Sequence, residues 1–182
     1  MSLPHLLLGL LNASPMSGYG LNKVFNTTIQ HFWTTDQSQI YRTLYKLEEE
    51  GKVRVETIIQ EDNPNKKVYY VTEVGAAELR QWLSLPLPET AIREAWLGQL
   101  FFSYQSDNAV VIQILEKYVD DVQQQLAALE ALQAAFPAGE ARAHIGREYQ
   151  FQLLTLDYGL DVHRFQIEWF KKAIQQIRQI PE

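Results

Sequence analysis

The C-terminal part of the chain carries its most regular apolar pattern, and this pattern constrains the fold more than any other feature. Side chains that are almost all apolar recur every seven residues in two interleaved series. A pattern sustained over four or more heptads is typical of a coiled coil. We therefore predict one long helix over residues 140–180. The two series, called here the heptad stripe, consist of Tyr149, Leu153, Leu156, Leu160, His163, Ile167, Phe170, Ile174 and Ile177.

A helix of this length rises by 1.5 Å per residue and would extend for about 60 Å, too far for one small domain to cover. A second apolar series over residues 108–136 predicts another helix, which ends before Pro137 and Gly139. This helix can cover part of the heptad stripe as a hairpin. We expect a second copy of the chain to bury the rest, so the stripe is predicted to be a homodimer interface. The alternative is a monomeric hairpin that packs against the N-terminal half.

Residues 36–51 form the second constraint. Apolar side chains at spacings of four and three predict a helix with one buried face. Asp36 precedes this pattern as an N-cap, with Gln39 three residues later as a capping box requires. Gly51 ends the helix because glycine tolerates a positive φ. The buried face consists of Ile40, Leu44 and Leu47.

The outer face of this helix is polar. Its amides, hydroxyls and cations are groups that contact base edges and phosphate oxygens in the major groove of DNA. An ordinary solvent-facing helix has a similar pattern, and the two tyrosines of this face are alternatively core residues. The face comprises Gln37, Ser38, Gln39, Tyr41, Arg42, Tyr45 and Lys46.

Two shorter helices precede this one. The first, over residues 3–12, is rich in leucine, and the second, over residues 18–29, begins after Ser17 as a capping residue. Three short helices joined by tight turns, the third with a polar outer face, are typical of a helix-turn-helix motif.

A β hairpin follows the third helix. Side chains alternate over residues 53–59, and a β-rich run returns over residues 67–71 after a loop, which places Lys66 and Lys67 near the tip. Thr72 then caps a further helix. Helices followed by a hairpin and another helix are the order of elements in a winged helix-turn-helix domain.

The predicted fold is therefore mainly α with a small β hairpin. A winged helix-turn-helix domain over residues 1–84 precedes a long helical, coiled-coil-like dimerisation domain over residues 93–182. Pro86 and Pro88 break regular structure and place a linker over residues 85–92.

Composition excludes several classes of function. The chain has no cysteine, which rules out disulfides, thiol catalysis and cysteine-based zinc sites. It has no phosphate-binding glycine loop, no nucleophile elbow and no close pair of metal-ligating histidines, so we expect no enzyme activity, cofactor or metal. No segment is long enough to span a membrane or begins like a secretion signal, which predicts a cytoplasmic protein.

Charge weighs against nucleic acid as a partner. The net charge is −6, and residues 1–90 hold 8 Lys and Arg against 10 Asp and Glu. DNA binding then requires the cations to gather on one surface, because local potential governs contact with phosphates. The alternative function is a protein-interaction module that does not bind DNA.

Three motifs resemble the PadR family of bacterial transcriptional regulators, namely PMSGY at residues 15–19, IYRTLYKLEEEG at residues 40–51 and KKVYYVTEVG at residues 66–75. The long helical C-terminal half is similar to that of the virulence-activator subgroup, whose C-terminal helices dimerise. The resemblance implies a homodimer that binds a partly palindromic operator in double-stranded DNA, with repression favoured over activation.

Position in these motifs and side-chain chemistry together select a DNA-facing set. Helix N-termini and hydroxyls suit phosphates, glutamine suits adenine, and arginine suits guanine or phosphate. The set is Ser17, Tyr19, Gln37, Ser38, Gln39, Tyr41, Arg42, Lys46, Lys66 and Lys67.

Two further hypotheses concern regulation. Trp82, Trp96 and Trp169 are predicted to line a pocket between the two domains for an unidentified small-molecule effector, although aromatic residues serve equally in core packing. His163 in the heptad stripe is a candidate pH sensor, and the alternative is an interface histidine whose hydrogen bonds are satisfied.

Overall fold

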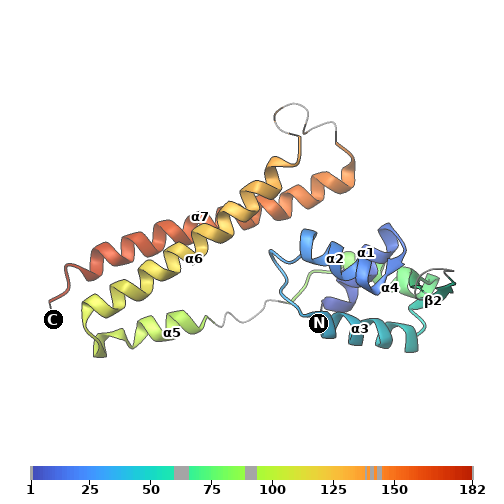
Figure 1. Cartoon of the computed structure of the whole chain (residues 1–182), viewed down its shortest axis with the longest axis horizontal. Helices are drawn as coiled ribbons and strands as arrows, with labels where there is room; N and C mark the ends of the chain where they lie inside the picture. The colour runs from blue at the N-terminus through green and yellow to red at the C-terminus, as the bar shows by residue number, and fades with distance from the viewer. Residues whose placement is uncertain are drawn as a thin grey trace. The chain divides into compact units, whose positions relative to one another are not determined.

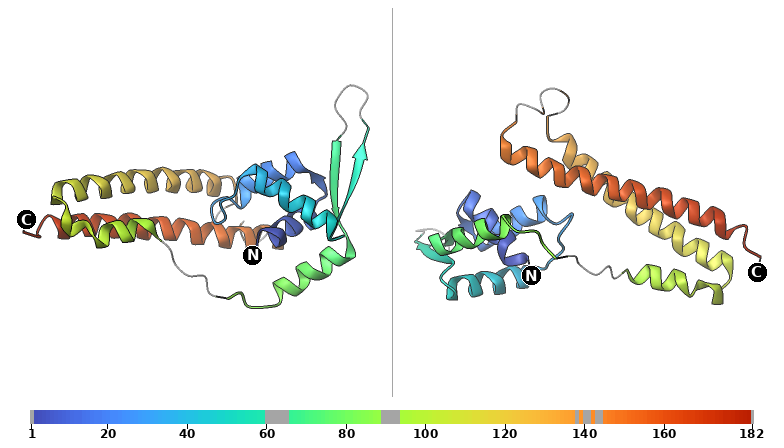
Figure 2. Two further views of the ribbon diagram at one scale, coloured as in Figure 1. Left: turned by 90° about the horizontal axis from the view of Figure 1, so that it is seen from below. Right: turned by 180° about the vertical axis from the view of Figure 1, so that it is seen from behind.

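The computed structural model describes residues 2–59, 66–88, 94–137, 139, 142 and 145–181. Its contacts divide the chain into two compact units, Met1–Glu89 and Thr90–Glu182, and each unit is described by itself (Figures 1 and 2). Within the described ranges, no helix is both long enough and apolar enough to cross a membrane.

The N-terminal unit has the predicted winged helix-turn-helix architecture. One strand was not predicted, because two residues are too few to show the alternation by which a strand is recognised. This strand pairs antiparallel with the second strand of the hairpin, so the sheet order is β1-β3-β2. The elements are α1 (Leu3–Ala13), β1 (Met16–Ser17), α2 (Gly18–Thr28), α3 (Gln37–Glu49), β2 (Val53–Ile58), β3 (Lys66–Val71) and α4 (Glu73–Leu83).

The inner face of α3 packs into the core of this unit. Ile40, Leu44 and Leu47 are at most 1% exposed, as the helical spacing predicted. They belong to one cluster with leucines of α1, Phe25 of α2 and Tyr69 of β3. Full burial of each such side chain contributes about 1.5–3 kcal/mol. The core therefore holds α3 by one face and leaves its polar face at the surface.

Side-chain caps begin three helices where the sequence predicted them. Ser17, Asp36 and Thr72 each accept a backbone N–H three residues further on, at 2.8–3.2 Å. The capping box of α3 is only half formed. The amide oxygen of Gln39 accepts a hydrogen bond from the Thr35 hydroxyl at 2.7 Å instead of bonding back to the cap.

Gly51 ends α3 as predicted. Its φ of 67° lies in the left-handed region. Its N–H donates to the carbonyl of Glu48 at 2.9 Å, and the N–H of Lys52 donates to the carbonyl of Leu47 at 2.8 Å. These two bonds form a Schellman motif, which satisfies the last carbonyls of the helix and turns the chain into β2.

The C-terminal unit is helical. Its helices α6 and α7 run side by side as a hairpin (Figures 1 and 2). The elements are α5 (Ala95–Phe101), the 3-10 helix η1 (Ser103–Gln105), α6 (Asn108–Ala134) and α7 (Arg147–Ile177). The last helix thus begins at residue 147 rather than 140, since the apolar pattern that predicted it starts only at Tyr149. Its 31 residues extend for about 46 Å, and the 27 residues of α6 nearly match that length.

The predicted role of the heptad stripe needs correction, because most of it is buried within the chain. Its members from Leu153 to Leu160 pack with Leu129 of α6, and those from Ile167 to Ile177 pack with Val111, Leu115 and Val119. Tyr149 is 52% exposed. A heptad pattern shows that some helix covers the stripe, but not which one. The covering helix is α6 of the same chain.

His163 also contacts α6 of its own chain. Its Nε2 lies 3.0 Å from Oε1 of Gln125, and its Nδ1 lies 2.6 Å from the carbonyl oxygen of Gly159. Both ring nitrogens therefore have partners inside the hairpin, so the ring is not positioned at the contact between copies that the sequence suggested.

Replacement of Gly51 by alanine tests the helix stop. We expect Gly51→Ala to lower the free energy of unfolding by about 1–2 kcal/mol, because a Cβ is strained at a left-handed position. Gly9→Ala is the matched control, since an added Cβ in the middle of α1 meets nothing within 4 Å and should raise this free energy by about 0.5–1 kcal/mol. Urea titration followed by circular dichroism measures both, and shifts of the same sign would contradict the assignment.

Candidate nucleic-acid interface

The outer face of α3 presents polar side chains to solvent. Gln37, Ser38 and Gln39 form its first turn, and Arg42 and Lys46 follow along the helix, all of them exposed. In a helix-turn-helix protein, the first turn of the recognition helix contacts base edges. In this chain, two amides and a hydroxyl occupy the corresponding first turn, with two cations behind them.

Tyr41 belongs to the same predicted set but also has a structural contact. It is half-buried, and its ring packs on the backbone of Gly18, where an added Cβ would lie 2.5 Å from Cε1 of the ring. A side chain at this position would displace the Tyr41 ring, so the close contact between the start of α2 and α3 depends on glycine here. Ser17 is half-buried as the cap of α2, whereas Tyr19 is 71% exposed.

The two predicted lysines lie on opposite faces of the β hairpin formed by β2 and β3. Lys66 pairs with Ile58, and Lys67 pairs with Thr57. Because successive side chains of a strand point to opposite faces, the two ammonium groups lie on opposite faces of the hairpin. Lys66 shares its face with Arg54, whose guanidinium lies 4.3 Å from the centre of the Tyr70 ring. The tip between the strands, residues 60–65, lies outside the described residues.

Ion pairs divide the cations of this unit into two groups. Lys52 bonds to Glu50 and Glu78, Arg54 bonds to Glu56, and Arg80 bonds to Glu73. Lys46 is 3.8 Å from Glu50, a long contact for an exposed side chain. Among the described residues of this unit, the cations without a carboxylate partner are Lys23, Arg42, Lys66 and Lys67. Three of these four lie on α3 or the hairpin, where the DNA-facing set was predicted.

A charged network joins the end of α3 to the other helices. The Lys52 ammonium lies 2.7 Å from Glu50 and 2.5 Å from Glu78, and Glu78 also lies 3.4 Å from Nε2 of His5. The hydrogen bonds to Glu50 and then to Glu78 raise the pKa of Lys52 above its ordinary value. The hydrogen bond from Lys52 lowers the pKa of the Glu50 carboxyl. Both shifts favour the charged pair at neutral pH.

The three tryptophans of the predicted effector pocket divide between the two units. Trp82 stacks on His5 in the N-terminal unit, with ring centres 4.9 Å apart. Trp96 and Trp169 meet in the C-terminal unit with ring centres 5.4 Å apart, and both contact Phe170. Trp96 and Trp169 attach α5 to the helical hairpin of α6 and α7, as ordinary aromatic packing does.

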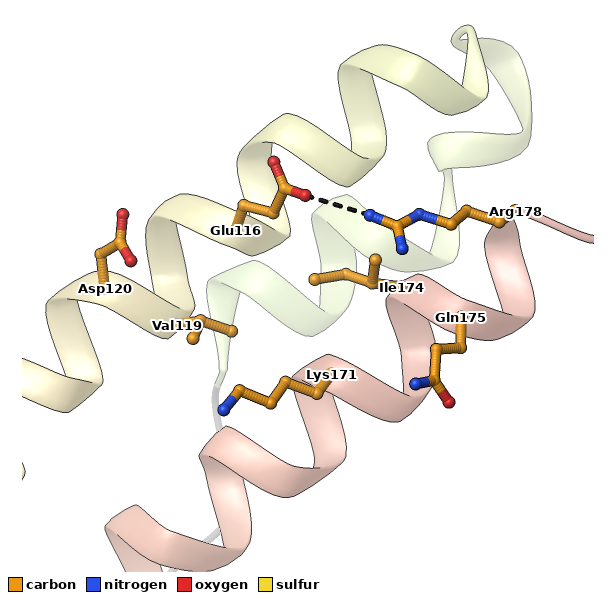
Figure 3. Close-up of a pocket in the computed structure, with 7 residues that line it drawn as sticks. All are labelled: Glu116, Val119, Asp120, Lys171, Ile174, Gln175 and Arg178. Atoms are coloured by element: carbon orange, nitrogen blue, oxygen red, sulfur yellow. Dashed lines mark hydrogen bonds and ion pairs between the residues drawn. The ribbon is translucent and has the colours of Figure 1, made fainter.

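The helical hairpin of α6 and α7 has a groove of about 270 Å³ that the sequence did not predict. Its carboxylates lie on α6 and its cations on α7 (Figure 3). None of the three tryptophans lines it. The lining residues are Glu116, Val119, Asp120, Lys171, Ile174, Gln175 and Arg178. In the part of the chain that the structure describes, no three His, Asp or Glu residues form a cluster that could hold a metal ion.

Comparison with known proteins identifies the family. The model of the transcriptional regulator PadR-like family matches residues 7–81, and that of the virulence activator alpha C-terminal domain matches residues 92–178. The negative transcriptional regulator PadR of Bacillus subtilis is 35% identical over 136 residues, which cover 74% of this chain and 72% of that protein. The chain belongs to the PadR-like family of transcriptional regulators. A probable transcriptional regulator of Mycobacterium tuberculosis is 43% identical over 90 residues, a match that covers about half of each protein, 50% and 48%.

Solved structures show the same fold. PadR of Bacillus subtilis in complex with operator DNA has a TM-score of 0.82 at 24% identity, over 97% of this chain and 99% of that one. The virulence activator AphA of Vibrio cholerae has a TM-score of 0.80 at 25% identity, over 97% and 98%. PadR in complex with p-coumaric acid has a TM-score of 0.77 at 23% identity, over 98% and 100%.

Tyr45 is 53% exposed on α3, in agreement with its predicted place on the outer face. Two features of this surface were missed in the sequence. The role of Gly18, whose lack of a side chain accommodates Tyr41, was not predicted. Thr35 was not singled out. The one available signal for it is its spacing, since Gln39 follows four residues later and the two side chains meet across one turn.

The charged network predicts how stability depends on pH. Because the pKa of Glu50 is lowered, its contribution to the free energy of unfolding is present above the ordinary carboxyl value of 4.5 and is lost as the pH falls through the lowered value. Because the pKa of Lys52 is raised, its contribution is present below the ordinary value of 10.5 and is lost as the pH rises through the raised value. Lys52→Gln should therefore destabilise most near neutral pH.

Chemical denaturation of both proteins across the pH range measures this difference. Lys23→Gln is the matched control, since Lys23 has no carboxylate partner among the described residues, and its effect should not vary with pH. A Lys52→Gln effect of equal size from pH 3 to pH 11 would contradict the assignment.

Proposed function

We propose that this regulator binds operator DNA sequence-specifically as a homodimer and represses transcription by occluding a promoter. The observation that carries the proposal is the distribution of cations that lack a carboxylate partner, because three of the four in this unit lie on α3 or the β hairpin. Local potential, rather than net charge, governs contact with phosphates. The proposal assigns the chain no catalytic reaction.

The outer face of α3 suits the major groove. The polar first turn, Gln37, Ser38 and Gln39, would contact base edges, and Arg42 and Lys46 would contact guanine or phosphate. The hairpin would add a phosphate contact through Lys66 or Lys67, one on each of its faces, and Tyr19 one at the start of α2. The operator complex of Bacillus subtilis PadR supports this assignment, since that protein shares the fold.

The homodimer is proposed to form through a second apolar side of α7. Four exposed side chains of this helix lie at spacings of three, four and seven residues, which places them on one face, opposite the buried heptad stripe. A row of exposed apolar side chains of this kind is typical of an interaction site. These residues, which replace the heptad stripe as the proposed interface, are Phe151, Leu154, Tyr158 and Phe165.

Repression and an effector are the remaining parts of the proposal. Repression is supported by the Bacillus subtilis relative, which is a negative regulator, although AphA is an activator. A small-molecule effector is supported by the p-coumaric acid complex of PadR. The indoles of Trp82, Trp96 and Trp169 offer an intrinsic fluorescence signal for its binding.

Salt dependence of DNA binding tests the function. Fluorescence anisotropy with labelled DNA from upstream of the chain's own gene should show an affinity that falls linearly with salt on logarithmic axes, because each phosphate contact releases counterions. Arg42→Ala should reduce the slope by about one. Lys66→Ala and Lys67→Ala, measured separately, identify the face of the hairpin that contacts phosphate. Addition of p-coumaric acid to the same titration tests the effector.

Arg80→Ala is the matched control, since it removes an equal charge from α4, where Arg80 pairs with Glu73. It should leave the slope unchanged. A scrambled duplex should bind more weakly than the upstream DNA. Absence of binding to either duplex at low salt would favour the protein-interaction module instead.

The molecular mass of the protein in solution tests the proposed dimer interface. Light scattering after size exclusion should give twice the chain mass of 21.1 kDa for the wild type. Leu154→Glu combined with Tyr158→Glu should give the monomer, because two charges would have to be buried in the interface. Gln123→Glu combined with Gln124→Glu adds the same charge to exposed positions of α6 and should leave the dimer intact. A dimer in both double variants would contradict this interface.

A further inference from the structure

One row of side chains on the outer face of α3 ends in a carboxylate. Four exposed residues recur at spacings of four, three and four, which places them along one side of the helix, opposite its buried face. They are Ser38, Arg42, Tyr45 and Glu49. The row therefore begins with groups that suit DNA and ends with Glu49, whose charge repels phosphate.

Nothing in the described part of the fold accounts for a carboxylate at this position. Asp36 caps the start of α3, and Glu50 pairs with Lys52 and lies 3.8 Å from Lys46. Among the described residues, Glu49 has neither an ion-pair partner nor a side-chain hydrogen bond. It also lies at the C-terminal end of the helix, where the macrodipole is negative and a carboxylate is unfavourable.

Charge therefore differs between the two ends of the row. Nε of Arg42 donates to the carbonyl of Ser38 at 3.4 Å, which directs this cation toward the first turn. Glu49 lies about 10 Å further along the axis, at 1.5 Å per residue, so Arg42 does not neutralise it. The last turn as a whole is acidic, because its carboxylates outnumber its one cation, Lys46.

The length of α3 allows more than one placement on DNA. Its 13 residues extend for about 20 Å, whereas the major groove is about 12 Å wide. When the helix enters by its first turn, that turn contacts base edges and the last turn is directed away from the duplex. When it lies lengthwise against the backbone, Glu49 comes among phosphates. Non-specific complexes rely on such backbone contacts.

We propose that Glu49 increases the sequence selectivity of this regulator by repelling phosphate in every placement except the one in which the first turn of α3 enters the groove. This inference rests on the proposed DNA-binding function and adds to it a means of rejecting non-specific sites. Selectivity is a difference between two affinities, and an unpaired charge that opposes the wrong complex increases it without any new contact to the right one. Glu49 touches no base and acts by exclusion.

Glu49→Gln in the full-length chain tests the proposal, because it removes the charge and keeps the shape. Fluorescence anisotropy compares a duplex enriched from a randomised library with a scrambled duplex. The variant should bind the scrambled duplex about three- to tenfold more tightly at low salt and the enriched duplex by no more than roughly twofold. The gain should shrink as salt is added, because salt screens the repulsion.

Glu48→Gln is the matched control. Glu48 is exposed and likewise has no ion-pair partner among the described residues. It lies about 100° around the helix from Glu49, on the side of Tyr69, whose pKa is raised first by burial and then by the nearby Tyr45 and Glu48. Both substitutions remove one carboxylate from the negative end of α3, so thermal unfolding should change alike in the two variants. Only Glu49→Gln should lower selectivity.

Four results would overturn the inference while leaving the function intact. Unchanged affinity for both duplexes would show that Glu49 meets no phosphate, and an equal gain on both would show a general effect of charge. The same loss of selectivity in Glu48→Gln would also show a general effect. Weaker binding to the enriched duplex alone would assign Glu49 a direct base contact. If the wild type enriches no sequence, the proposed sequence-specific function itself fails, and this inference fails with it.

Discussion

The arrangement of elements in the DNA-binding unit depends most on the hydrogen bonds of the Thr72 hydroxyl. This hydroxyl donates to the carbonyl of Gly51 at 2.7 Å, and it accepts the N–H of Gly75 at the start of α4 at 3.2 Å. The backbone N–H of Thr72 donates to the carbonyl of Lys52 at 3.0 Å. The end of α3, the start of β2, the end of β3 and α4 therefore meet at one residue. This junction fixes the angle between the polar helix and the hairpin.

Ion pairs engage some of the cations of this acidic unit and leave others free. Lys52, Arg54 and Arg80 are paired with carboxylates, while Arg42, Lys66 and Lys67 have no such partner among the described residues. The two charges of an ion pair nearly cancel at a distance, so a paired residue contributes little to the electrostatic potential that DNA would meet. The net charge of the sequence is thus a poor guide to the potential at α3.

Much of the fold was predictable because it follows from local rules. The periodicity of Ile40, Leu44 and Leu47, the capping residues and the positive φ of Gly51 each depend on a few neighbouring residues, and the structure agrees with all of them. Strand β1 was not predictable, since it exists only through its pairing with β3. The start of the last helix was placed too early, because the apolar pattern contains no signal upstream of Tyr149.

The sequence predicted which residues belong to the candidate site, but not how their side chains are arranged. Sequence position selected the polar residues of α3, whereas the contact of Tyr41 with Gly18 and the opposite directions of the two wing lysines needed coordinates. The sequence predicted that the helix over residues 108–136 covers part of the heptad stripe, and in the structure α6 covers most of it. Periodicity shows that a stripe is buried, but not how much of it each partner covers. The second apolar side of α7 was hidden by the stronger first pattern.

A helix with two apolar sides has a consequence for the cellular response of this regulator. In the proposed dimer, a protomer would bury the second side of α7 only on meeting another copy, so the dimer that the operator would capture would dissociate on dilution. Occupancy of a palindromic operator would then rise with roughly the square of the protomer concentration while monomers predominate. A modest change in synthesis or degradation of the chain would therefore produce a sharper change in transcription, without any ligand.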